Sequence, residues 1–120
     1  MWISIQTKRV KVSARMRLKI ENFVSRTFER ERRYVGSAVI GIRPATLGND
    51  MGYECRITVW SHYLGLTVVS DCGDTIRTAV QQAALRSREA IRRRLHKRRS
   101  KTRRMTRGRV DRWLSQSALE

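Results

Sequence analysis

Residues 53–70 read YECRITVWSHYLGLTVVS, and this stretch decides the fold. Its first half alternates with a period of two, which puts an apolar set on one face of a strand and a mixed set on the other. The apolar set is Tyr53, Cys55, Ile57 and Val59, and the mixed set is Glu54, Arg56, Thr58 and Trp60. A turn at 62–65 can then lead into a second strand at 66–70. The stretch therefore predicts a β-hairpin with one face turned toward a core.

Two more strands are predicted upstream of this hairpin. Residues 2–6 alternate, with Ile3 and Ile5 on the same side. Residues 36–42 alternate through Ala38, Ile40 and Ile42, and we expect Pro44 and the turn-forming residues after it to close that strand.

Two segments have helical periodicity. From Ser13, a suitable N-cap, apolar residues recur every three or four positions as far as Phe28, and basic residues occupy the opposite side. Asp71 and Asp74 resemble a capping arrangement for a second helix, whose apolar positions continue to Leu95 and whose last turns are basic.

The predicted order is strand, helix, three strands, helix. This order predicts an α+β fold, in which a four-stranded sheet has both helices packed on one face. The right-handed crossover rule makes the first two strands parallel if they are neighbours. We expect a single α+β domain over residues 1–99, followed by a basic, disordered C-terminal tail over 100–120.

The charge of the chain predicts a polyanionic partner. Lys and Arg number 27 against 10 acids, for a formal net charge of +17. Between residues 86 and 109 there are 13 Lys or Arg and only one acid, Glu89. A basic helix end gains about 0.3–1 kcal/mol per charge from the helix dipole, so we expect fold stability not to account for so many. Contact with nucleic-acid phosphates accounts for them better.

Several other classes of protein are disfavoured. No apolar stretch, lipidation motif or signal sequence points to a membrane, so we expect a cytoplasmic protein with no membrane partner. Zinc-finger, leucine-zipper and helix-turn-helix patterns are missing from the sequence, which favours RNA over DNA. Trp2, Tyr53 and Trp60 could stack on bases, but the aromatic, glycine-rich motif of open-sheet RNA binders is missing, and we expect them to be packed or partly exposed.

The polar residues do not predict catalysis or a cofactor. Cys55, His62, Cys72 and His96 have no spacing typical of zinc sites, so we expect free thiols and no metal. His62, Asp50 and Glu54 are scattered and predict no catalytic group, so we expect no enzyme, no cofactor and no small-molecule substrate.

The order of elements, the pattern of Val12, Ser13, Met16 and Arg17, and the pairing of Asp71 with Ile76 resemble the ribosome hibernation promoting factor and ribosome-associated inhibitor family. The resemblance covers residues 2 to about 99. It implies a β-α-β-β-β-α fold similar to a double-stranded-RNA-binding domain. It also implies a factor that docks in the decoding channel of the small ribosomal subunit against its rRNA, blocks mRNA and tRNA, and inhibits translation under stress.

The chain departs from the family pattern at Cys72, Gly73 and Arg77, as a specialised member would. Only about twenty residues follow the core, which implies the short type, and we expect a monomer. By the resemblance, Arg17 and Arg88 match family positions closely, and Arg86, Arg92 and Arg93 match by location.

The candidate RNA-binding residues, from the resemblance and from the two basic helix sides together, are Arg15, Arg17, Lys19, Arg26, Arg86, Arg88, Arg92, Arg93 and Lys97. The alternative is a general RNA- or DNA-binding basic protein that is not specific for ribosomes.

Overall fold

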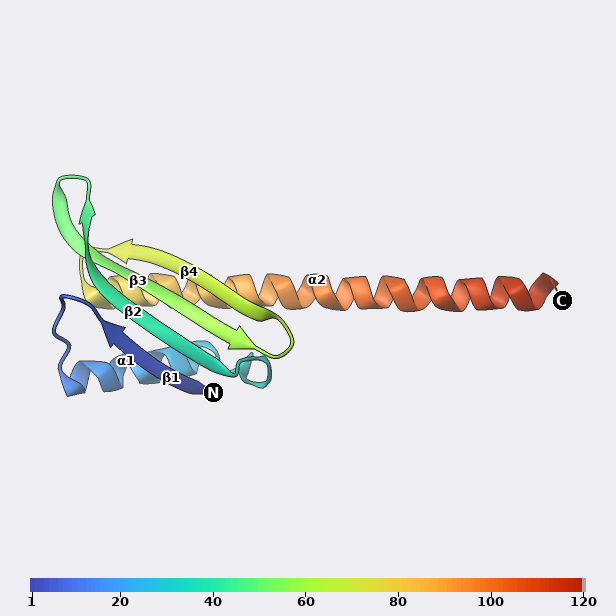
Figure 1. Ribbon diagram of the computed structural model, residues 1–120, viewed down its shortest axis with the longest axis horizontal. Coiled ribbons are helices and arrows are strands. Elements are labelled where there is room, and N and C mark those ends of the chain that lie inside the picture. The colour runs from blue at the N-terminus through green and yellow to red at the C-terminus, as the bar shows by residue number, and fades with distance from the viewer. Residues whose placement is uncertain (120) are drawn as a thin grey trace.

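A computed structural model describes the backbone of residues 1–119 and the side chains of residues 1–99. The elements follow in the order β1 (Trp2–Thr7), α1 (Ala14–Thr27), a short 3-10 helix (Arg32–Tyr34), β2 (Ser37–Leu47), β3 (Asp50–Ser61), β4 (Gly65–Gly73) and α2 (Ile76–Leu119). This is the predicted β-α-β-β-β-α, α+β fold. Figure 1 shows both helices on the same side of the sheet.

The sheet has the order β1-β2-β3-β4. β1 pairs parallel with β2, as the crossover rule predicts, and the other two pairs are antiparallel. Ile5, Ile40, Ile57 and Val69 are aligned across the four strands, which puts them all on one face. The prediction of which side chains of each strand face the core is therefore confirmed.

The core lies between that face and the helices. Ile40 and Ile57 from the sheet, Val24 from α1, and Ala83 and Ile91 from α2 are all at most 1% exposed. α1 starts where predicted, because the Ser13 side chain accepts a hydrogen bond from the Met16 backbone N–H at 3.1 Å.

The prediction that Pro44 helps to close β2 is wrong, because the strand continues to Leu47. Of the turn-forming residues predicted to close it, Gly48, Asn49 and Asp50, the first two form the turn that ends the strand. The Ile42 carbonyl accepts from the Lys8 N–H on the β1 side, so Pro44, two residues later, turns its nitrogen to that same side. β1 has already ended there, at Thr7. The N–H that proline lacks is therefore not needed for the sheet.

The prediction that Asp71 and Asp74 cap the second helix is also wrong. Asp71 lies within β4, where its carboxylate accepts a hydrogen bond from the Cys72 backbone N–H at 2.8 Å. Thr75 caps α2 instead, because its hydroxyl accepts from the Thr78 N–H at 3.1 Å.

The backbone of α2 continues as helix to Leu119, well past the sheet (Figure 1). It crosses the expected boundary at residue 99 without a break. The side chains of 100–120 lie outside the described part, so the division into a ribosome-binding domain (1–99) and a basic tail (100–120) stays a prediction. No helix among the described residues is long and apolar enough to cross a membrane.

Candidate RNA-binding surface

The solvent side of α1 carries three of the candidate residues. Ile20, Val24 and Thr27 fill the buried stripe of the helix. Arg15, Lys19 and Arg26 are spaced at i, i+4 and i+11 on the opposite side, and all three are exposed. Among the described residues, none of the three has a hydrogen-bond or ion-pair partner, so their charges are available to an external anion.

Arg17 does not belong to that group. Its Nη1 donates a hydrogen bond of 3.4 Å to the Ile5 carbonyl, so its side chain is turned toward β1. The structure therefore brings together three of the four α1 candidates and leaves the fourth on the flank of the helix.

The candidates on α2 differ in what they contact. Arg86 lies 3.4 Å from an Asp71 carboxylate oxygen and donates to the Ser70 carbonyl at 3.3 Å. Arg93 lies 3.8 Å from Glu89, one turn earlier, and both side chains are exposed. Lys97 is exposed, with no partner within the described part of the chain. An external anion therefore meets Lys97 and Arg93 most easily.

Arg92 pairs with Glu31 through its Nε. Glu31 is only 4% exposed and lies just after α1, so this ion pair ties the end of α1 to the middle of α2. Arg88, one turn before Arg92, is half-buried, and its Nε has no partner among the described residues. Arg92 thus has an internal role that sequence reasoning did not assign to it.

Arg94, Arg98 and Arg99 also bind inside the molecule. Arg94 donates to the Leu66 carbonyl at 2.8 Å, and to the Leu64 carbonyl and the Thr67 hydroxyl as well. Arg98 lies 4.1 Å from the centre of the Tyr63 ring, and Arg99 donates to the Tyr34 hydroxyl at 2.6 Å. These contacts fasten α2 to the β3–β4 turn and to the 3-10 segment.

The expectation that fold stability does not account for the basic end of the second helix therefore needs correction, since part of that charge holds the fold together. Sequence spacing carried no signal for these contacts, because the partners are carbonyls, hydroxyls and rings 27 to 65 residues away.

The far face of the sheet also carries basic residues. Arg43 donates to Glu54 at 2.9 Å, and this hydrogen bond, followed by the charge of Glu54, raises the pKa of Arg43. Trp2 is exposed and Trp60 partly so, whereas Tyr53 packs against the core. The expectation of packing or partial exposure fits Tyr53 and Trp60 but not Trp2, which is 74% exposed.

Both cysteines are free thiols, as predicted. Cys55 is aligned with Asp71 on the core face, so Cys72, the next residue, belongs to the opposite face of the sheet. The two thiols cannot share one metal ion in this arrangement. Burial, followed by the charges of Asp71 and Glu54, raises the pKa of Cys55 to about 12.

The fold is similar to two solved structures. The first is a ribosomal subunit interface protein from Coxiella burnetii, with a TM-score of 0.66 and 13% sequence identity, over 78% of this chain and 96% of that one. The second is the N-terminal domain of Protein Y from Thermus thermophilus, with a TM-score of 0.62 and 17% identity, over 78% of this chain and 98% of that one. No protein-family model and no curated protein sequence matches the chain.

These similarities confirm the fold that the resemblance to the ribosome hibernation promoting factor family implied. At 13% and 17% identity they concern the fold alone. The nine candidate residues are placed by the structure, and their contact with RNA stays a prediction.

Proposed function

We propose that this protein binds the small ribosomal subunit through phosphates of its rRNA and blocks the decoding channel, so that translation stops without any chemical step. The protein would act as a cytoplasmic monomer in a stress response, as a ribosome hibernation factor. One of the two similar structures is named as a ribosomal subunit interface protein, which supports a ribosomal partner.

The observation that carries the proposal is the basic side of α1, whose charges have no partner among the described residues. Arg15, Lys19 and Arg26 project from a helix whose other side is anchored in the core. A rigid helix holds its charges at fixed spacings, so it can match the phosphates of one folded RNA shape better than another. A basic face on rigid elements therefore favours a defined RNA site over uniform attraction.

Arg93 and Lys97, one turn apart on α2, are further exposed basic residues on the helical side of the molecule. Phosphate binding by such residues displaces counterions and should be strongly salt-dependent. No carboxylate partner among the described residues has to be given up for Arg15, Lys19, Arg26 or Lys97 to bind a phosphate.

The test is co-sedimentation with ribosomal subunits, together with inhibition of translation in a cell-free system. The variant Arg15→Gln/Lys19→Gln/Arg26→Gln removes three charges and keeps helix propensity. We expect it to lose selectivity for the small subunit and to release inhibition.

The matched control is Arg30→Gln/Arg32→Gln/Arg33→Gln. It removes the same charge from exposed side chains between α1 and β2. We expect this control to weaken binding to all RNA similarly and to keep subunit selectivity. Equal behaviour of the two triple variants would contradict the proposal and would favour a general RNA- or DNA-binding protein, whose affinity follows net charge alone.

A further inference from the structure

The face of the sheet that the helices leave open carries a row of exposed apolar side chains. Trp2, Ser37, Trp60 and Leu66 are aligned across β1 to β4. Trp2 is 74% exposed, Leu66 61% and Trp60 39%. Neighbouring strands lie about 4.8 Å apart, so the two tryptophans stand on backbones about 10 Å apart, with the small Ser37 between them.

The Trp60 ring is held in place from two sides. A Cβ at Gly36 would lie 2.9 Å from its Cε3 atom, so the indole lies directly on the backbone of Gly36. The His62 ring packs edge-on against it, with 4.3 Å between ring centres. One ring of the row is therefore fixed in advance, while Trp2 projects into solvent.

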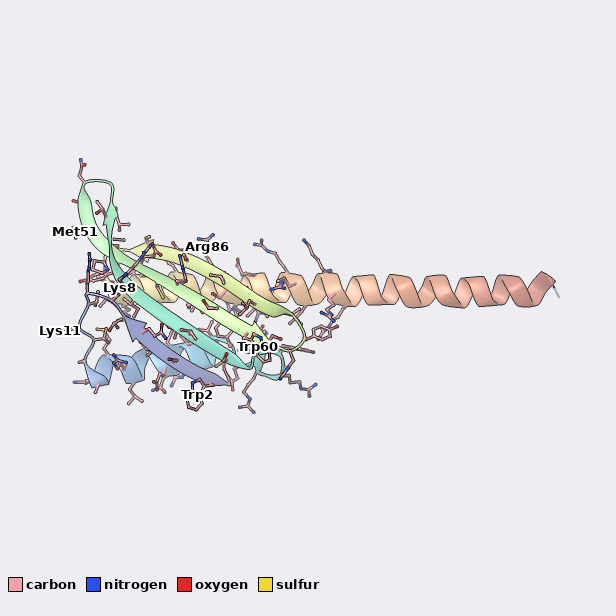
Figure 2. All side chains as sticks on the ribbon, viewed as in Figure 1. Trp2, Lys8, Lys11, Met51, Trp60 and Arg86 are labelled. Atoms are coloured by element: carbon pink, nitrogen blue, oxygen red, sulfur yellow. The ribbon has the colours of Figure 1, made fainter. Side chains whose placement is uncertain are left out.

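The other end of the same face is basic. A hollow of about 410 Å³ lies where β1 ends, and its lining includes Lys8, Arg9, Arg43 and Glu54. Arg56 lines the adjoining hollow. Figure 2 shows Lys8 near this end of the sheet, with Trp2 and Trp60 toward the other end. Along β3, Arg56 is four residues, or about 14 Å, from Trp60.

From this arrangement we infer that the open face binds a single-stranded RNA segment, with a base held between Trp2 and Trp60 and phosphates held by Lys8, Arg43 and Arg56. A base between the two rings would be within reach of both, because stacked aromatic rings have their centres 4.5–7 Å apart. A positively charged groove with aromatic side chains beside it is the usual composition of single-strand binding surfaces.

Charge decides against a second copy of this chain as the occupant. Two open faces placed together would bring Lys8, Arg43 and Arg56 of both copies into one interface, where Glu54 of each copy offsets only part of the positive charge. An RNA strand supplies flat bases for the tryptophans and negative charge to offset the excess of cations on this face. The site goes beyond the proposed function, which uses the opposite, helical side.

The test measures binding of the full chain to a fluorescent oligouridylate of about ten nucleotides, at physiological salt. Trp2→Leu keeps an apolar side chain and removes the ring, whereas Trp2→Phe keeps a ring. Met51→Ser is the matched control, because Met51 is also 74% exposed but lies at the β2–β3 turn. Figure 2 shows Met51 well away from the tryptophans.

We expect Trp2→Leu to weaken oligouridylate binding about 5- to 150-fold, which corresponds to the loss of one stacked base. Trp2→Phe should weaken oligouridylate binding much less, and Met51→Ser should bind the oligouridylate as tightly as the unmodified chain does. Inorganic polyphosphate, which has the charge but no bases, should bind Trp2→Leu and the unmodified chain equally. Because Trp2 is largely exposed, Trp2→Leu should fold normally by circular dichroism.

Unchanged oligouridylate binding by Trp2→Leu would overturn the inference. Equal losses in Trp2→Leu and Trp2→Phe would also overturn it, because a stacking site must distinguish a ring from an aliphatic side chain. The α1 triple variant, run in the same assay, separates this inference from the proposed function. Loss of subunit docking in that variant bears on the helical side alone, and loss of oligouridylate binding in Trp2→Leu bears on the open face alone.

Discussion

Arg92 offers the sharpest test of how the two helices are held together. Its Nε binds Glu31, whose side chain is only 6% exposed, while the Arg92 side chain is 43% exposed. Removal of the partner of a fully buried charge costs about 3–5 kcal/mol, and loss of an exposed ion pair costs about 0–1 kcal/mol. Since only one member of this pair is buried, we expect Arg92→Gln to lower the free energy of unfolding by about 2 kcal/mol.

For a chain of this size, that loss should lower the melting temperature by about 8 °C. Arg93→Gln is the control, because Arg93 and its partner Glu89 are 77% and 63% exposed, and we expect a shift of about 2 °C or less. The double variant Arg92→Gln/Glu31→Gln should recover much of the lost melting temperature, because Glu31→Gln removes the buried charge that Arg92→Gln leaves unpaired. Thermal unfolding followed by circular dichroism measures all four chains. Equal melting temperatures for Arg92→Gln and Arg93→Gln, or no recovery in the double variant, would refute this reasoning.

Three further outcomes are expected. Ile57→Asp should prevent folding, because Ile57 is fully buried, whereas Thr58→Asp on the open face should lower the free energy of unfolding far less. Equal losses of stability in urea titrations would mean that the core and open faces of β3 are assigned wrongly. Deletion of residues 100–120 should weaken binding to ribosomes and to unrelated RNA by similar factors. It should also lower the slope of log affinity against log salt concentration by about 0.7–0.9 per lost phosphate contact. Loss of selectivity for the small subunit in this variant would count against a specific helical surface. Because its pKa is raised to about 12, Cys55 should resist iodoacetamide at pH 8 until urea unfolds the chain; mass spectrometry showing Cys55 labelled before Cys72 would contradict its burial.

The sequence was sufficient to predict the sheet, because alternation along a strand directly records which side chains are buried. Ile57 and Ile40 lie where the period of two puts them, and Ser13 caps α1 as its spacing indicated. The ends of elements were harder to predict. Pro44 is usually a strand breaker, and it is tolerated here only because β1 stops before it, which no local pattern of β2 records.

The candidate surface could be predicted only in part, for a related reason. Local spacing grouped Arg15, Lys19 and Arg26 correctly, since one helix decides which face they share. The ion pair of Arg92 with Glu31 joins residues 61 positions apart, so it depends on the packing of α1 against α2. A count of positive charges also treats all arginines alike, whereas the structure separates those with internal partners from those without.

This separation ranks the basic residues of α2 as candidate ligands for the proposed RNA partner. A phosphate can take Arg93 away from Glu89 at little cost, because an exposed pair contributes at most about 1 kcal/mol. It cannot take Arg92 without leaving the buried carboxylate of Glu31 unpaired, which costs several times more. Lys97 has no partner to lose among the described residues. A change in RNA binding caused by Arg92→Gln would therefore mix a lost contact with a loosened fold, whereas Lys97→Gln and Arg93→Gln would report on the contact itself.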